Sequence, residues 1–132
     1  MKYTLVLLLL LASCTQVAVQ TTDTAPTGIA HTVEMSASGF SPNIVTIKAG
    51  DAVEFVNKGT IPIWPASDVH PTHTVYPGSG IGKCGSSEES AIFDACGGVP
   101  PGESYTFTFL QRGNWSLHDH LHPLLTGTIV VQ

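Results

Sequence analysis

Basic residues and sulfur-containing residues are scarce in this chain of 132 residues. Five Lys and Arg stand against ten Asp and Glu, the formal net charge is −5 at pH 7, and there are three Cys and two Met. A surface with this balance repels nucleic acid, so a nucleic-acid-binding function is excluded. A phosphate-binding glycine motif and a serine in a nucleophile elbow are also missing. We therefore expect that the protein is not an enzyme.

Long hydrophobic runs are missing as well, with one exception near the start. The run from Leu5 to Ala12 is too short to span a bilayer as a helix and follows a single lysine, which predicts a signal peptide over residues 1–13. The junction Leu11-Ala12-Ser13-Cys14 resembles the lipobox of exported lipoproteins, in which the thiol of Cys14 carries the lipid anchor. The alternative is ordinary cleavage near Gln20, giving a soluble secreted protein. Both alternatives place the rest of the chain outside the cytoplasm, and the first predicts a membrane-anchored lipoprotein of the periplasm or cell surface.

The remainder divides into a tether and one domain. Residues 14–29 are rich in Thr and lack the periodicity of a helix or strand, which predicts a flexible tether. Residues 30–132 are enough for one domain with a modest core.

Short runs that alternate apolar and polar residues, separated by Gly and Pro, predict an all-β sandwich or small barrel for this domain. Alternation also predicts which side chains share a face. Bulky Trp115 and Leu117 mark the inward set of one strand, so Asp119 should point inward and His118 outward. The strands are expected near Thr32 to Ala37, Ile44 to Lys48, Ala52 to Asn57, His73 to Tyr76, Ser104 to Leu110, Asn114 to His120 and Thr126 to Val131. In the fourth of them, Val75 should be buried, which turns His73 inward too.

Five of the six histidines fall in two short clusters, His70 to His73 and His118 to His122. Neutral imidazole is the commonest protein ligand for late first-row metals, and Asp119 among three histidines adds an oxygen donor suited to Cu(II) or Zn(II). Binding residues gather on loops at the ends of rigid strands, where both clusters lie. A chance gathering of surface histidines is the alternative.

The cysteines that remain after Cys14 form an even pair, Cys84 and Cys96. In an oxidising compartment this favours a disulfide, which would close a Gly- and Ser-rich loop and stabilise the fold by about 2 to 3 kcal/mol. The competing interpretation makes Cys96 a copper thiolate.

Three segments of the domain resemble the cupredoxins, and the resemblance extends from about Val33 to Val131. It implies a Greek-key β-sandwich or barrel of the cupredoxin type that binds one copper ion, with zinc as a substitute. The segments are Phe40 to Ile47 with Ala49-Gly50-Asp51 and Val53 to Asn57, then His73-Thr74-Val75-Tyr76-Pro77, and finally Pro101 to Phe109 with Gly113 to His122 and Gly127 to Val131.

The chain departs from the blue copper members of that family at the ligand strand. Asp119 stands where those members carry cysteine, His122 falls at the place of the second histidine, and Leu124 or Leu125 takes the axial position, where a Met is usual. The stretch from Gly113 to His120 also resembles the His-x-His segments of multicopper oxidases, in which alternate histidines face outward to copper.

Two ligand sets follow from these resemblances. In the first, His73, Asp119 and His122 form an inward site in which a carboxylate replaces the thiolate. In the second, His118 and His120 bind metal on the outer face, together with His70 in one version, and His73 and Asp119 form a buried hydrogen-bonded pair.

The function expected from this sequence is extracytoplasmic copper binding for delivery, storage or resistance, because carboxylate and imidazole ligands lack the strong electronic coupling of a copper thiolate. The expected partners are copper, the membrane through the lipid anchor, and a redox or copper-transfer protein. The alternatives are an electron-transfer protein and a metal-free interaction module.

Overall fold

The computed structural model of this protein describes residue 28 and residues 30–132. The signal peptide predicted at residues 1–13, the predicted lipidation site Cys14 and all of the tether predicted at residues 14–29 except Gly28 lie outside the described residues. Within the described part of the chain, no helix is long and apolar enough to cross a bilayer.

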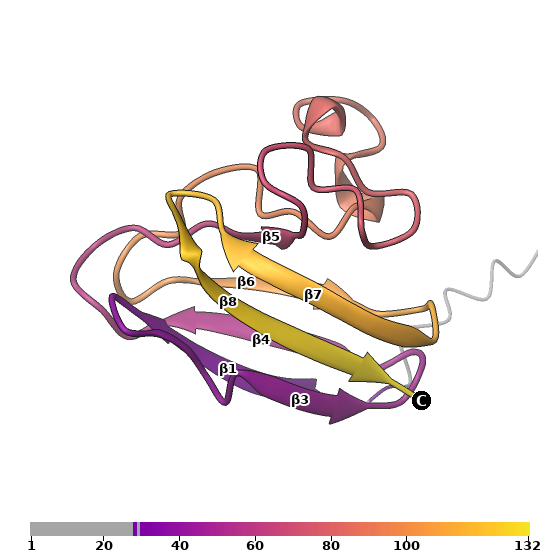
Figure 1. The fold of residues 1–132 in the computed structure, drawn as a ribbon, viewed down its shortest axis with the longest axis horizontal. Coiled ribbons are helices and arrows are strands. Elements are labelled where there is room, and N and C mark those ends of the chain that lie inside the picture. The colour runs from indigo at the N-terminus through magenta and orange to yellow at the C-terminus, as the bar shows by residue number, and fades with distance from the viewer. Residues whose placement is uncertain (1–27, 29) are drawn as a thin grey trace, which may run out of the picture.

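Two four-stranded sheets face each other, so the predicted all-β sandwich is confirmed (Figure 1). One sheet has the order β2-β1-β4-β6 and the other β3-β8-β7-β5, so the chain crosses between sheets several times. The strands are β1 (Ala30–Ser36), β2 (Gly39–Ser41), β3 (Ile44–Ile47), β4 (Ala52–Asn57), β5 (Pro65–Ser67), β6 (Ser104–Thr108), β7 (Gly113–Asp119) and β8 (His122–Val131), with 3-10 helices η1 (Ile81–Lys83) and η2 (Glu89–Ala91).

The core lies between the two sheets and follows the alternation of the strands. In β4 every second side chain is buried, and Val53 and Phe55 are both completely enclosed. A group of stacked and edge-on aromatic rings fills the space towards β6, with Phe107 at 5.3 Å from Phe93 between ring centroids. Burial of such large apolar rings supplies most of the driving force for folding.

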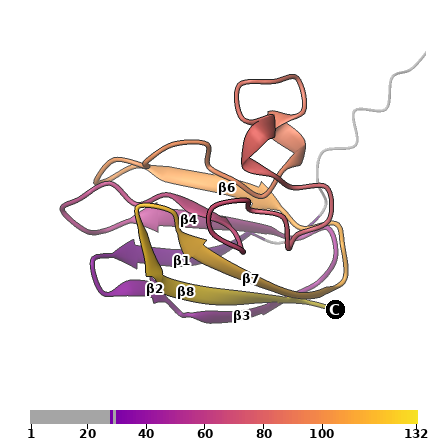
Figure 2. The same ribbon diagram turned by 45° about the horizontal axis from the view of Figure 1, so that its top comes forward.

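The segment between β5 and β6 lies outside the two layers and carries both short helices (Figures 1 and 2). It is fixed to the sandwich by Phe93, whose fully buried ring packs on Phe55 at 5.7 Å, and by Tyr76, whose ring meets Phe109 at 5.5 Å. The Tyr76 hydroxyl also accepts a hydrogen bond from the backbone nitrogen of Leu110 at 3.0 Å. A long irregular segment is therefore held firmly against the sandwich at strands β5 and β6.

The prediction of a strand at His73 to Tyr76 is wrong, because these residues form a loop. His73 has a positive φ of 59°, so the alternation of an extended strand does not apply there. His73 is nonetheless fully buried, as predicted, whereas Val75 is 37% exposed, against the prediction.

In β7 the alternation correctly places Leu117 and Asp119 inside, but His118 is completely buried too. Two features explain this. The pairing of β7 with β8 shifts register between His118 and Asp119, and such irregularities re-aim side chains. The loop that follows β5 then covers the face on which His118 lies, with Asp68 and His70 both close to its ring.

Candidate metal centre

Three imidazoles from two distant parts of the chain converge at the end of β7. His73 comes from the loop after β5, and His118 and His120 come from β7 and the turn that follows it. One nitrogen from each ring can be chosen so that all three lie within 4.8 Å of one another. The two histidine clusters of the sequence are therefore neighbours in space.

His73 is one of the two completely buried rings of the cluster. Its backbone nitrogen donates to the carbonyl of Val69 at 2.8 Å, which closes a tight turn around the positive φ. Its Nδ1 lies 2.5 Å from a carboxylate oxygen of Asp94, and its Nε2 lies 2.9 Å from Nδ1 of His120. Both nitrogens are therefore engaged, one with a carboxylate and the other with the rest of the cluster.

His118 has two buried nitrogens that lack a hydrogen-bond partner. Its Nδ1 lies 3.0 Å from a carboxylate oxygen of Asp68, but not in the orientation of a hydrogen bond. Burial lowers the pKa of His118 below its usual value, and nearby His73 lowers that pKa further. A neutral imidazole with unused nitrogens is the form that binds a metal ion.

His120 lies at the solvent side of the cluster. Burial is the first cause that lowers its pKa, followed by the proximity of His73 and His70. The Trp64 ring covers it at 4.4 Å between centroids, and the backbone nitrogen of His120 donates to the Trp64 carbonyl at 2.8 Å. The exposed ring of His70 lies 4.9 Å from the His120 ring, at the mouth of the cluster.

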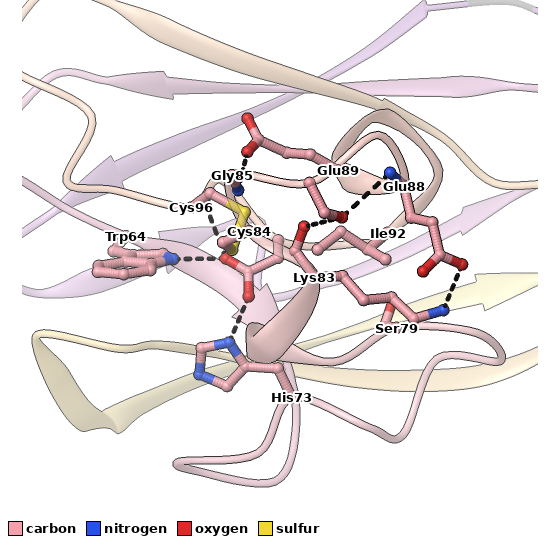
Figure 3. The surroundings of a disulfide bond; sticks show 12 residues. Trp64, His73, Ser79, Lys83, Cys84, Gly85, Glu88, Glu89, Ile92 and Cys96 are labelled. Atoms are coloured by element: carbon pink, nitrogen blue, oxygen red, sulfur yellow. Dashed lines mark hydrogen bonds and ion pairs between the residues drawn. A yellow bond between two sulfur atoms is a disulfide. The ribbon is translucent and has the colours of Figure 1, made fainter.

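Asp94, which the sequence analysis did not select, is a buried carboxylate beside His73. It lies two residues before Cys96, and the disulfide favoured by the sequence, Cys84–Cys96, is present in the structure. Figure 3 shows Trp64, His73 and Cys96 around this point, and their contacts with Asp94 are Trp64 Nε1 at 2.6 Å and the Cys96 backbone nitrogen at 2.8 Å. The only sequence signal for it is an acid set among apolar neighbours, Ile92-Phe93-Asp94-Ala95.

The structure does not bring Asp119 to His73. One oxygen of Asp119 lies 2.6 Å from Nδ1 of His122, and the other accepts the backbone nitrogens of Trp64 at 2.9 Å and Leu121 at 3.0 Å. The buried His73–Asp119 pair of the second ligand set is therefore wrong, and Asp94 takes the place of Asp119 in it. Metal binding by Asp119 and His122 stays a prediction.

The donor chemistry of the cluster fits a copper or zinc ion. Metal–imidazole distances are about 2 Å, so two nitrogens on one ion lie roughly 3 Å apart. The 2.9 Å between His73 Nε2 and His120 Nδ1 matches that spacing. The unpartnered nitrogens of His118 supply a third donor. Both cysteines of the described residues are joined in a disulfide, so sulfur is not part of this donor set.

No family model and no curated protein matches this sequence. Solved structures do match the fold. A purple cupredoxin from Nitrosopumilus maritimus has a TM-score of 0.58 at 16% identity, covering 76% of this chain and 98% of its own. An oxidised plastocyanin from Dryopteris crassirhizoma has a TM-score of 0.56 at 22% identity, and the match covers 77% of this chain and 100% of the plastocyanin chain. A reduced amicyanin mutant has a TM-score of 0.57 at 18% identity, and the match covers 78% of this chain and 82% of the amicyanin chain. The chain therefore has the cupredoxin fold, as its sequence resemblance implied.

Proposed function

We propose that this protein binds one copper ion through His73, His118 and His120. The observation that carries this proposal is the pair of buried His118 nitrogens without hydrogen-bond partners, beside two further imidazoles. An unpaired buried polar group costs free energy, so its retention between two other ligands favours a partner that is bound in the working protein. Copper held this way would be ligated by nitrogen and protected from solvent by Trp64.

The role that we propose is copper delivery, storage or resistance outside the cytoplasm. The apolar run before Cys14 and the lipobox-like junction support export and a lipid anchor in the periplasm or at the cell surface. A site made of imidazoles binds copper without a thiolate, which supports metal handling over fast electron transfer. A copper-transfer or redox protein is the partner that this role requires.

Electron transfer is the second candidate, and the fold favours it, because the similar structures include oxidised and reduced forms of plastocyanin and amicyanin. It would need a thiolate in the donor set, and the two cysteines of the described residues, Cys84 and Cys96, are joined in a disulfide. Colour separates the two candidates. A pale copper complex supports imidazole ligation, whereas intense visible absorption would show that a thiolate binds.

The test is a copper titration of the full chain against a chelator, with Cu(II) and with Cu(I), repeated with Zn(II). His118→Ala should weaken binding at least tenfold because it removes an interior ligand. His31→Ala is the matched control, since His31 is paired with Asp51 at 3.0 Å, outside the cluster. His122→Ala tests the remaining ligand set of the sequence analysis. If the parent binds copper but no variant differs from it, the assignment of these three ligands fails. If the parent binds no copper, the proposal fails and the interaction module becomes the better explanation.

A further inference from the structure

The two oxygens of Asp94 have different tasks. Oδ1 accepts the indole N–H of Trp64 at 2.6 Å and the backbone N–H of Cys96 at 2.8 Å. Oδ2 faces only Nδ1 of His73, at 2.5 Å. The side chains of Asp94 and His73 are both completely buried, so water does not compete for these contacts.

A carboxylate accepts hydrogen bonds and donates none, so Nδ1 of His73 must carry the proton. The other ring nitrogen, Nε2, then keeps its lone pair and faces the cluster, 2.9 Å from Nδ1 of His120. We propose that Asp94 is the positioning residue of the metal centre: it fixes His73 in the Nδ1–H tautomer and so presents Nε2 to the metal. The role in metal binding rests on the proposed function, whereas the tautomer itself does not.

Because Oδ1 of Asp94 accepts two N–H donors, replacing Asp94 with asparagine tests the tautomer assigned to His73. In Asp94→Asn, the amide oxygen must stay with Trp64 and Cys96, because the amide nitrogen would put donor against donor there. The amide nitrogen is then directed at Nδ1 of His73, which has to accept. His73 switches to the Nε2–H tautomer and loses the lone pair that binds metal. The indole and the disulfide-bonded Cys96 thus decide which way the amide lies.

The chain contains a matched control with the same arrangement. Oδ1 of Asp119 also accepts two backbone N–H groups, and its Oδ2 faces Nδ1 of His122 at 2.6 Å. Asp119→Asn should therefore invert the tautomer of His122 and leave that of His73 unchanged. It repeats the substitution at a second buried carboxylate.

The experiment uses the metal-free full chain labelled with ¹⁵N-histidine, and reads each tautomer from two-bond ¹H–¹⁵N spectra at pH 8. The parent chain should show Nδ1–H at His73, and Asp94→Asn should show Nε2–H. Copper affinity, measured by chelator competition, should fall about 10- to 100-fold in Asp94→Asn, the usual loss when a carboxylate partner of a ligand histidine is removed. The Cu(II) electron paramagnetic resonance spectrum should change with it. Asp94→Glu keeps an acceptor-only group and should keep the Nδ1–H tautomer.

An Nε2–H signal at His73 of the parent chain overturns the inference, even if Asp94→Asn does not fold. So does an unchanged His73 tautomer in a folded Asp94→Asn protein. If the parent shows the expected tautomer but binds no copper, the proposed function fails while the positioning of His73 by Asp94 stands. If copper binds and its affinity is the same in Asp94→Asn, only the positioning role is refuted.

Discussion

Replacing His118 with leucine should make the metal-free protein more stable and the copper-loaded protein less stable than the parent. His118 is completely buried and neither ring nitrogen has a hydrogen-bond partner. A buried polar group left unpaired costs about 1–3 kcal/mol. Repacking a side chain of different shape offsets part of that gain, typically by about 1 kcal/mol. The expected net rise in the free energy of unfolding is therefore about 1 kcal/mol without metal.

Copper reverses the order. A ligand that binds only the folded state adds about 2.7 kcal/mol of stability when its free concentration is 100 times its dissociation constant. The parent chain gains this increment and His118→Leu gains little or none, so the two unfolding curves exchange places when copper is added.

The assay is thermal or urea unfolding of both proteins, with chelator and with buffered copper. One kcal/mol corresponds to a shift of about 4–8 °C in Tm for a domain of this size. If the metal-free His118→Leu protein unfolds well below the parent, the imidazole contributes to stability through a contact such as that of its Nδ1 with Asp68, at 3.0 Å. The reasoning from unpaired nitrogens would then be refuted.

Three further predictions concern the fold around the site. Cys84→Ser/Cys96→Ser should lower the free energy of unfolding by about 2–3 kcal/mol in urea titrations, because it opens a loop with a sequence separation of 12; an unchanged midpoint would contradict this. The pKa values of His118 and His120 are lowered in the folded state. Below about pH 6.5 the unfolded chain therefore binds more protons than the folded chain. The free energy of unfolding of the metal-free protein should decline as the pH falls below about 6.5 and be level above that pH. His118→Leu should show a shallower decline. Asn57→Leu should cost about 2–4 kcal/mol, because the buried amide donates to two backbone carbonyls at 2.8 Å each; a loss below 1 kcal/mol would show that water replaces it.

The sequence was sufficient to predict the layers of the fold, because alternation in strands such as β4 reports directly which face meets the core. It failed where alternation does not operate. β5, with a proline among three residues, is too short to show a period, and the segment at His73 is a loop. His118 was expected to face outward, and only the loop packed over β7 reveals that it is enclosed.

The candidate site could be predicted as a pair of histidine clusters, but not as a set of contacts. Which carboxylate meets His73 depends on how the disulfide-closed loop folds back, and that is a tertiary property. Asp119 and Asp94 are both buried beside a histidine, and composition cannot distinguish them. Strand parity correctly placed Asp119 inside, but not its partner.

The backbone of His73 has a practical consequence for mutagenesis. At a φ of 59° an L-residue with a Cβ is strained, and asparagine and glycine are the residues that tolerate this region best. Histidine already carries a Cβ at this φ, so an alanine at this position removes the imidazole and leaves the main-chain strain in place. Glycine removes the imidazole and relieves the strain as well, so the difference in stability between the glycine and alanine variants measures how much strain the chain accepts to hold a histidine there.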